Sequence, residues 1–301
     1  MSESSRRVFA RVAFLLIAFP LALVAAAQAS PRAECRSVPS KLLNRKVQYC
    51  ILLPPSYDND RTRRYPVLYF LHGLGQNEQA MIDSGGFNLT QDLWEQMQIG
   101  EFLIVAPDGD RSFFINSRDG KRPYEDFLIQ EMMPFIDAHY RTKEGRHNRG
   151  VAGVSMGGYG ALHLALRHPD LFGSVSANSA ALILNPPEGK VDSESATALS
   201  RALGGAFGSP FDRAFWNRNS PFTLARESPP PAGLQIYFDC GTEDDYGFNR
   251  GAEEFHDLLE SLHIPHEFHL YPGGHDINYF AEHLPDSLAF QSKALGATPA
   301  K

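Results

Sequence analysis

Five residues in the middle of the chain have the types and spacing of an activated serine. Gly153-Val154-Ser155-Met156-Gly157 fits the pattern G-x-S-x-G, in which the serine occupies a sharp turn between a strand and a helix. The two glycines give the crowded backbone room on either side of that turn. An apolar run precedes the motif and an amphipathic one follows it. We therefore predict that Ser155 is a nucleophile.

A serine hydroxyl is a weak nucleophile at neutral pH, so it needs a base and a group that holds the base. His275 follows the last expected strand, and Gly273 and Gly274 give it a flexible loop. We predict that His275 is the base. His263, His266 and His269 lie before or within that strand, and the sequence joins none of them to a carboxylate at ligand spacing, so no metal site is predicted.

The acid that orients the base should follow the preceding strand. Four carboxylates occur there, at Asp239, Glu243, Asp244 and Asp245. Asp239 falls within the strand end, whereas Asp244 lies in the loop after Gly241, where it can reach a histidine. Asp244 is favoured, Asp245 and Glu243 remain alternatives, and a run of acids is also common in a solvated loop.

An attacked carbonyl becomes an oxyanion, so backbone N–H donors should face the serine. The amide of Met156 starts the following helix, where N–H groups have no partner within the helix. The second predicted donor is the amide of Leu74, in the glycine-rich turn His72-Gly73-Leu74-Gly75. A turn that only reverses the chain is the alternative for that segment.

These residues need a scaffold, and the chain alternates short apolar runs with amphipathic ones. This alternation is typical of a mostly parallel central sheet with helices on both faces, an α/β fold. The predicted strands are residues 47–53, 67–71, 102–106, 150–154, 174–177, 234–239 and 267–271. The predicted helices are residues 124–140, kinked at Pro134, then 156–167, 251–262 and 277–294.

Residues 185–232 interrupt the alternation. The segment is rich in Pro, Ser and Gly and carries Phe207, Phe211, Phe215, Trp216 and Phe222. We expect an excursion over the sheet edge. Its aromatic residues fit either a lid over a pocket or a small core beneath the insertion.

Composition excludes some classes of protein. The 301 residues are 43% hydrophobic and 21% charged, which is typical of an ordered globular chain. The net charge is −7 and residues 30–301 contain no run of Lys and Arg, so nucleic-acid binding is not predicted. A single domain over residues 30–301 is expected, and nothing in the sequence favours one oligomeric state.

The N-terminus has the layout of an export signal. Arg6, Arg7 and Arg11 precede an apolar run, and Ala27-Gln28-Ala29 fits a cleavage site, so residues 1–29 are predicted to be a removed signal peptide. The mature chain would then be periplasmic or secreted, without a stable membrane span. A retained anchor is the alternative, although Pro20 interrupts the run, and the Arg pair leaves the twin-arginine route open.

Export changes the interpretation of the three cysteines. In an oxidising compartment Cys35 and Cys50 can pair near the mature N-terminus, which leaves Cys240 unpaired. We predict this disulfide. Cys240 lies in an apolar run and is expected to be a buried small hydrophobic residue.

Taken together, these segments resemble the putative-esterase branch of the α/β-hydrolases, which includes S-formylglutathione hydrolases (esterase D), feruloyl and acetyl-xylan esterases and the antigen 85 mycolyltransferases. The resemblance rests on five segments: Leu71-His-Gly-Leu-Gly75, 124–131 with 136–141, 151–160, 168–172 and Gly273-Gly-His275. It implies an α/β-hydrolase fold with Ser155, Asp244 and His275 as the triad and the Leu74 and Met156 amides as oxyanion donors. It adds weight to Asp244, because the family places its acid three residues after the glycine matched by Gly241.

The expected function is an exported serine esterase that needs no cofactor and hydrolyses a small-molecule ester, aryl or carbohydrate-linked. Residues 110–118 and 185–232 are expected to shape its pocket. An acyltransferase or thioesterase on the same fold is the alternative, and the export signal and a different oxyanion segment argue against glutathione chemistry. A non-catalytic binding domain is the alternative of another class.

Overall fold

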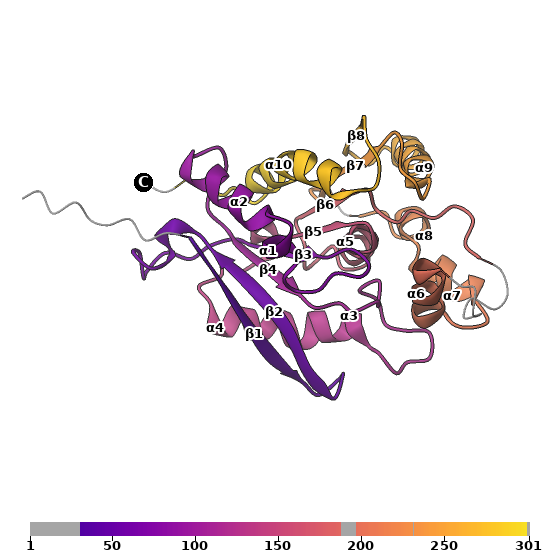
Figure 1. Ribbon diagram of the computed structural model, residues 1–301, viewed down its shortest axis with the longest axis horizontal. Helices are drawn as coiled ribbons and strands as arrows, with labels where there is room; N and C mark the ends of the chain where they lie inside the picture. Colours follow the sequence, from indigo (N-terminus) through magenta and orange to yellow (C-terminus); the bar gives the residue numbers. More distant parts are fainter. Residues whose placement is uncertain (1–30, 188–196, 231, 300–301) are drawn as a thin grey trace, which may run out of the picture.

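The computed structural model describes residues 31–187, 197–230 and 232–299 (Figure 1). The predicted signal peptide, residues 1–29, lies outside this part of the chain, as do residues 188–196 and 231 of the expected excursion. In the described part, no helix combines the length and the apolar character that crossing a membrane requires.

A mixed sheet of eight strands forms the centre of the molecule. Its spatial order is β1-β2-β4-β3-β5-β6-β7-β8, with β1 and β2 antiparallel to their neighbours and the rest parallel. The predicted mostly parallel sheet is therefore confirmed. The strands are β1 (Arg32–Ser40), β2 (Arg45–Leu53), β3 (Val67–Leu71), β4 (Leu103–Pro107), β5 (Arg149–Val154), β6 (Ser174–Asn178), β7 (Gln235–Gly241) and β8 (Glu267–Tyr271).

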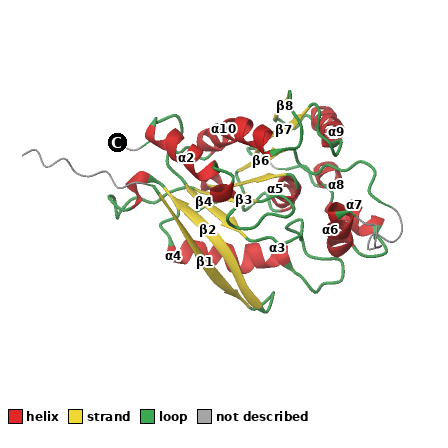
Figure 2. Cartoon of the chain, in the orientation of Figure 1, coloured by secondary structure: helices red, strands yellow, loops and turns green. Residues whose placement is uncertain are grey.

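Helices cover both faces of the sheet, as Figure 2 shows. On one face α1 (Ala80–Asp83), α2 (Gly86–Glu95) and α10 (Ile277–Ala294) enclose a core that includes Phe70, Trp94 and Leu288. The larger core on the other face includes side chains of α3 (Tyr124–Phe127), α4 (Met133–His139), α5 (Met156–Arg167), α6 (Ala198–Phe207), α7 (Arg213–Asn219), α8 (Pro221–Glu227) and α9 (Phe248–Ser261). Strands β3, β4 and β5 are buried along their whole length, as expected for parallel strands covered on both sides.

The predicted helix over residues 124–140 is divided into three segments. A π-helical turn, Leu128–Met132, separates α3 from α4, and Pro134 lies at the start of α4. Proline has no N–H to donate to the preceding turn, so the helix changes its hydrogen-bond spacing just before it. The bend predicted at Pro134 thus takes the form of a wide turn.

A buried charged group holds α3 against the helix that follows Ser155. Glu125 Oε2 accepts a hydrogen bond from His163 Nε2 at 2.9 Å, and Oε1 accepts one from His168 Nε2 at 2.7 Å. Burial raises the pKa of Glu125, but these two bonds and the nearby Arg167 charge outweigh it and hold the pKa well below its usual value. The carboxylate and the two histidines therefore form a hydrogen-bonded clamp between α3 and the end of α5.

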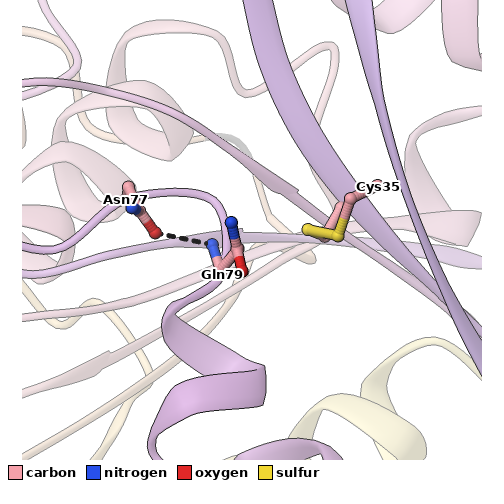
Figure 3. The surroundings of a disulfide bond; sticks show 4 residues. Cys35, Asn77 and Gln79 are labelled. Carbon is pink, nitrogen blue, oxygen red and sulfur yellow. Dashed lines mark hydrogen bonds between the residues drawn. A yellow bond between two sulfur atoms is a disulfide. The ribbon is translucent and has the colours of Figure 1, made fainter.

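The predicted disulfide between Cys35 and Cys50 is present. The two cysteines lie directly opposite each other in the β1–β2 hairpin, with Cα atoms 4.0 Å apart. Figure 3 shows the bond together with the turn before α1, where the Gln79 N–H donates to Asn77 Oδ1. Strand β1 was not predicted, and its disulfide attaches this edge strand to the sheet.

Candidate active site

Ser155 sits on a strained turn between β5 and α5. Its backbone has φ 55° and ψ −116°, a conformation that residues other than glycine rarely adopt. A Cβ at Gly153 would lie 2.3 Å from the Gly157 carbonyl oxygen, and one at Gly157 would lie 2.0 Å from the Leu71 carbonyl oxygen. Only glycine fits at either position. These two close contacts explain why the motif has a glycine two residues before and two residues after the serine.

Ser155, His275 and Asp244 form a chain of hydrogen bonds. Ser155 Oγ lies 2.9 Å from His275 Nε2, and His275 Nδ1 lies 2.7 Å from Asp244 Oδ2. A carboxylate can only accept, so the imidazole donates from Nδ1 and leaves Nε2 free to accept the serine proton. This arrangement allows the histidine to take a proton from the serine as the serine attacks.

The carboxylate of Asp244 is buried and fully engaged. Its Oδ1 accepts from the amides of Tyr246 and Phe248, and its Oδ2 faces His275 and the buried Cys240 thiol. Burial raises the pKa of Asp244, but the hydrogen bonds from His275 and from the two amides together outweigh it, so the pKa lies below its usual value. The carboxylate is therefore held ionised beside the imidazole.

Three aromatic rings surround the imidazole of His275. Tyr246, Phe248 and Phe280 contact it edge to face, with ring centroids 4.9, 5.4 and 5.3 Å away. They fix the plane of the ring and reduce the access of water to it. The sequence analysis did not identify these residues, because aromatic residues before α9 and within α10 have no distinctive spacing.

His72 holds the predicted oxyanion loop in place. Its Nδ1 donates to the Gly73 carbonyl at 2.8 Å, and its Nε2 accepts from the Gly109 amide at 2.8 Å. The ring thus joins the loop after β3 to the loop after β4. Burial lowers the pKa of His72, which keeps the ring neutral as this pattern requires. Sequence analysis gave His72 no role of its own.

A pocket of about 610 Å³ opens over Ser155. Leu74 and Met156, whose amides are the predicted oxyanion donors, both line it. Residues 110–118 contribute Arg111, and residues 185–232 contribute 197–199. Other parts of the wall were not predicted from the sequence: Gln76, Ala181, Tyr246, Phe248 and the start of α10.

A smaller apolar side pocket adjoins the first. Its volume is about 140 Å³, and Gln76, Val154, Ile277 and Phe280 line both spaces. Residues of β3, α1, α2 and α10 close its far end: Phe70, Ala80, Met81, Leu89, Ala281 and Leu284. The site therefore consists of the larger, open pocket beside Arg111 and a smaller apolar recess under α10.

The aromatic residues of the 185–232 segment form a small core. Phe207, Phe211, Phe215 and Trp216 pack on one another, and Phe207 and Trp216 also contact Tyr159 of α5. Phe222 packs separately on Phe255 of α9. None of the five lines the pocket over Ser155. Of the two interpretations of these side chains, the small core is the one the structure supports.

The sequence profile of the family described as "Putative esterase" matches residues 40–291, most of the chain. The chain belongs to the putative esterase family. The resemblance noted in the sequence is therefore confirmed.

A curated protein is similar over most of the chain. Esterase Rv1288 of Mycobacterium tuberculosis (strain ATCC 25618 / H37Rv) is 34% identical over 245 residues, which cover 75% of this chain and 51% of that protein. The chain thus spans about half the length of this curated relative.

Solved structures share the architecture. A ferulic acid esterase superposes with a TM-score of 0.74 at 26% identity, covering 88% of this chain and 99% of that one. An S-formylglutathione hydrolase from Agrobacterium tumefaciens gives a TM-score of 0.71 at 20% identity, covering 89% and 96%. Together with the eight-stranded sheet they identify the α/β-hydrolase fold.

Proposed function

We propose that this chain is an exported serine esterase that hydrolyses carboxylic esters through an acyl-enzyme on Ser155. The observation that carries the proposal is the hydrogen-bonded series from Ser155 Oγ to His275 to Asp244, at 2.9 and 2.7 Å, at the base of a pocket. Membership of an esterase family agrees with it.

In the proposed reaction, Ser155 Oγ attacks the ester carbonyl carbon while His275 Nε2 takes the hydroxyl proton. The carbonyl oxygen becomes negative and accepts hydrogen bonds from the Leu74 and Met156 amides. The C–O bond to the alcohol then breaks, and His275 returns the proton to the leaving alcohol. Water repeats the sequence on the acyl-enzyme, with His275 again as base and Asp244 stabilising the imidazolium.

The shape of the site favours an ester with a small apolar or aryl acyl group. The recess under α10 is lined mostly by apolar side chains, whereas the wider pocket adds the polar side chains of Arg111 and Thr197, beside which we place the alcohol. A ferulic acid esterase among the similar structures supports an aryl acyl group, and a carbohydrate-linked ester is the other substrate that we propose. No step of this reaction calls for a cofactor.

The predicted export signal supports a location outside the cytoplasm for this reaction. We propose that residues 1–29 are removed and that residues 30–301 act as one periplasmic or secreted domain. The Cys35–Cys50 disulfide supports an oxidising compartment.

Hydrolysis assays of purified S155A and H275A beside the wild type test the proposal. The substrates are p-nitrophenyl acetate, butyrate and octanoate, methyl ferulate and S-formylglutathione. Each variant should lose several orders of magnitude in kcat and retain about 10³-fold over the uncatalysed reaction. Controls are S228A at the exposed end of α8 and H269A on β8, which should keep full activity.

The substrate ranking distinguishes the alternatives. Turnover of the oxygen esters that is lost in S155A supports the esterase, whereas preference for S-formylglutathione indicates a thioesterase. Faster release when an alcohol acceptor is added indicates a transferase. An inactive wild type, or full activity in S155A, would contradict the proposal.

A further inference from the structure

Two histidines and a glutamate come together at the edge of the sheet, between the last turns of α9 and the start of β8. One ligand atom each from His256, Glu260 and His266 lies within 4.8 Å of the other two. His256 and Glu260 are one helical turn apart on α9, and His266 lies just before β8. The sequence analysis considered His266 with His263 and His269, because it could not see that the turn brings His266 back against α9.

We propose that His256, Glu260 and His266 bind a zinc ion. Two imidazole nitrogens and one carboxylate are donors that Zn²⁺ prefers, and the fourth tetrahedral position is left for water. This site takes no part in the proposed esterase reaction.

The tautomer of His266 already fits a metal ligand. Its Nδ1 faces the Ile264 carbonyl oxygen at 2.8 Å, and a carbonyl can only accept, so the proton is on Nδ1. The lone pair of Nε2 therefore points at His256, whose Nδ1 lies 2.7 Å away. Metal-binding histidines commonly donate their second N–H to a backbone carbonyl in this way.

Both imidazole rings are held by aromatic packing. The ring of His266 stacks on Phe238 and that of His256 on Phe268, and the two phenylalanines stack on each other at 4.8 Å. This packing restricts rotation of both rings, so His256 Nδ1 and His266 Nε2 stay directed toward each other. Glu260 is exposed and can turn its carboxylate toward them.

Binding replaces the hydrogen bond between the two histidines. The proton on His256 Nδ1 moves to Nε2, and both lone pairs then point at the ion. Zinc with bonds of about 2.0 Å places two tetrahedral nitrogens about 3.3 Å apart, so the rings separate by about half an ångström.

The ion would fasten the end of α9 to the start of β8. The five residues of β8 span about 17 Å and separate this cluster from the loop that carries His275. The expected role is therefore structural, stabilising the strand that leads to the proposed base without contact with the ester.

Zinc titration of the untagged full chain, after removal of metal with a chelator, tests this inference. We expect one equivalent of Zn²⁺ to bind and to raise the melting temperature. H256Q and H266Q should each weaken binding at least about 100-fold, because loss of an outer-shell partner alone costs 10–100-fold. E260Q should weaken it at least about 10-fold by the same comparison.

Control variants distinguish this site from a general affinity of surface histidines. H269Q, on β8 outside the cluster, and E253Q, on the same helix, should bind zinc like the wild type. Because Glu260 is exposed, E260Q keeps the packing intact even if a histidine variant folds poorly. The proposal would be overturned if the wild type did not bind zinc, or if H256Q, H266Q and E260Q bound zinc with the affinity of the wild type. Either outcome is independent of the hydrolysis assays.

Discussion

Two neighbouring carboxylates in one loop differ in what they contact. Asp244 accepts hydrogen bonds from His275 and from two amides and is 7% exposed, whereas Asp245 is exposed. Sequence spacing alone left these two residues as alternatives. The adjacent position thus provides a matched control for the buried carboxylate.

We expect D244N to reduce kcat on p-nitrophenyl acetate by about 10⁴-fold, because an amide can no longer hold the imidazole in the required tautomer. D245N should stay within a factor of about two of the wild type, since exposed substitutions away from such contacts have small effects. Steady-state kinetics at saturating substrate compares the two. A large loss in D245N with little in D244N would reverse the assignment.

Several residues of the site could be named from the sequence because short-range chemistry dictates them. The glycines around Ser155 and Gly241 in the acid loop avoid close contacts, because a Cβ at 153, 157 or 241 would lie 2.3, 2.0 or 2.4 Å from a backbone oxygen. His72 and Phe280 could not be given roles in this way. Their importance depends on which loops lie beside them, and only the tertiary structure determines that.

At the scale of elements, the buried parallel strands were predictable, whereas the edge strand β1 was not. The residues of β3 to β5 are buried on both faces and form continuous apolar runs. Strand β1 is mostly half-buried or exposed, so its residues lack that signal. The short helices α1 and α6 to α8 were not predicted either, since few turns give little periodicity.

Strands β6 and β7 and helix α10 meet at a buried carboxyl group beneath the His275 loop. Asp239 Oδ2 accepts from Asn178 Nδ2 at 2.6 Å, and Oδ1 accepts from the Tyr279 hydroxyl at 2.7 Å. Burial is the main cause that raises the pKa of Asp239 to about 6. The folded chain therefore holds a proton that the unfolded chain releases between about pH 4 and 6.

This difference makes the free energy of unfolding decrease as pH rises from 4 to 7. In D239N the amide at position 239 does not titrate, so this pH-dependent contribution to the free energy of unfolding disappears. The free energy of unfolding of D239N minus that of the wild type should increase by about 2 kcal/mol between pH 4 and pH 7. Urea denaturation at each pH measures it, and a constant difference would show that Asp239 titrates normally.

At the scale of the whole molecule, the two edges of the sheet are secured by different means. Strands β1 and β2 are joined covalently, and β8 at the other edge is joined to α9 through the histidine cluster. Strand β5, which leads to the proposed nucleophile Ser155, lies between them in the sheet. A substitution that breaks the disulfide or the histidine cluster should therefore lower the free energy of unfolding with little effect on the rate of ester hydrolysis.

Replacing both disulfide cysteines tests this expectation. The bond closes a loop of 15 residues, which corresponds to about 3 kcal/mol in the chain-entropy model. We expect C35A/C50A to lose about that much free energy of unfolding while kcat changes less than about twofold. A reducing agent should lower the stability of the wild type only. Unchanged stability in the double variant would show that β1 frays independently of the sheet.

Phe280 belongs both to the wall of the apolar recess and to the ring of contacts around His275. A ligand that fills the recess therefore presses on the same side chain that fixes the imidazole plane. Occupancy and alignment of the base are mechanically linked, so part of the binding energy of a well-fitting acyl group is used to order the catalyst. The enzyme would then distinguish among esters by differences in kcat more than by differences in binding affinity.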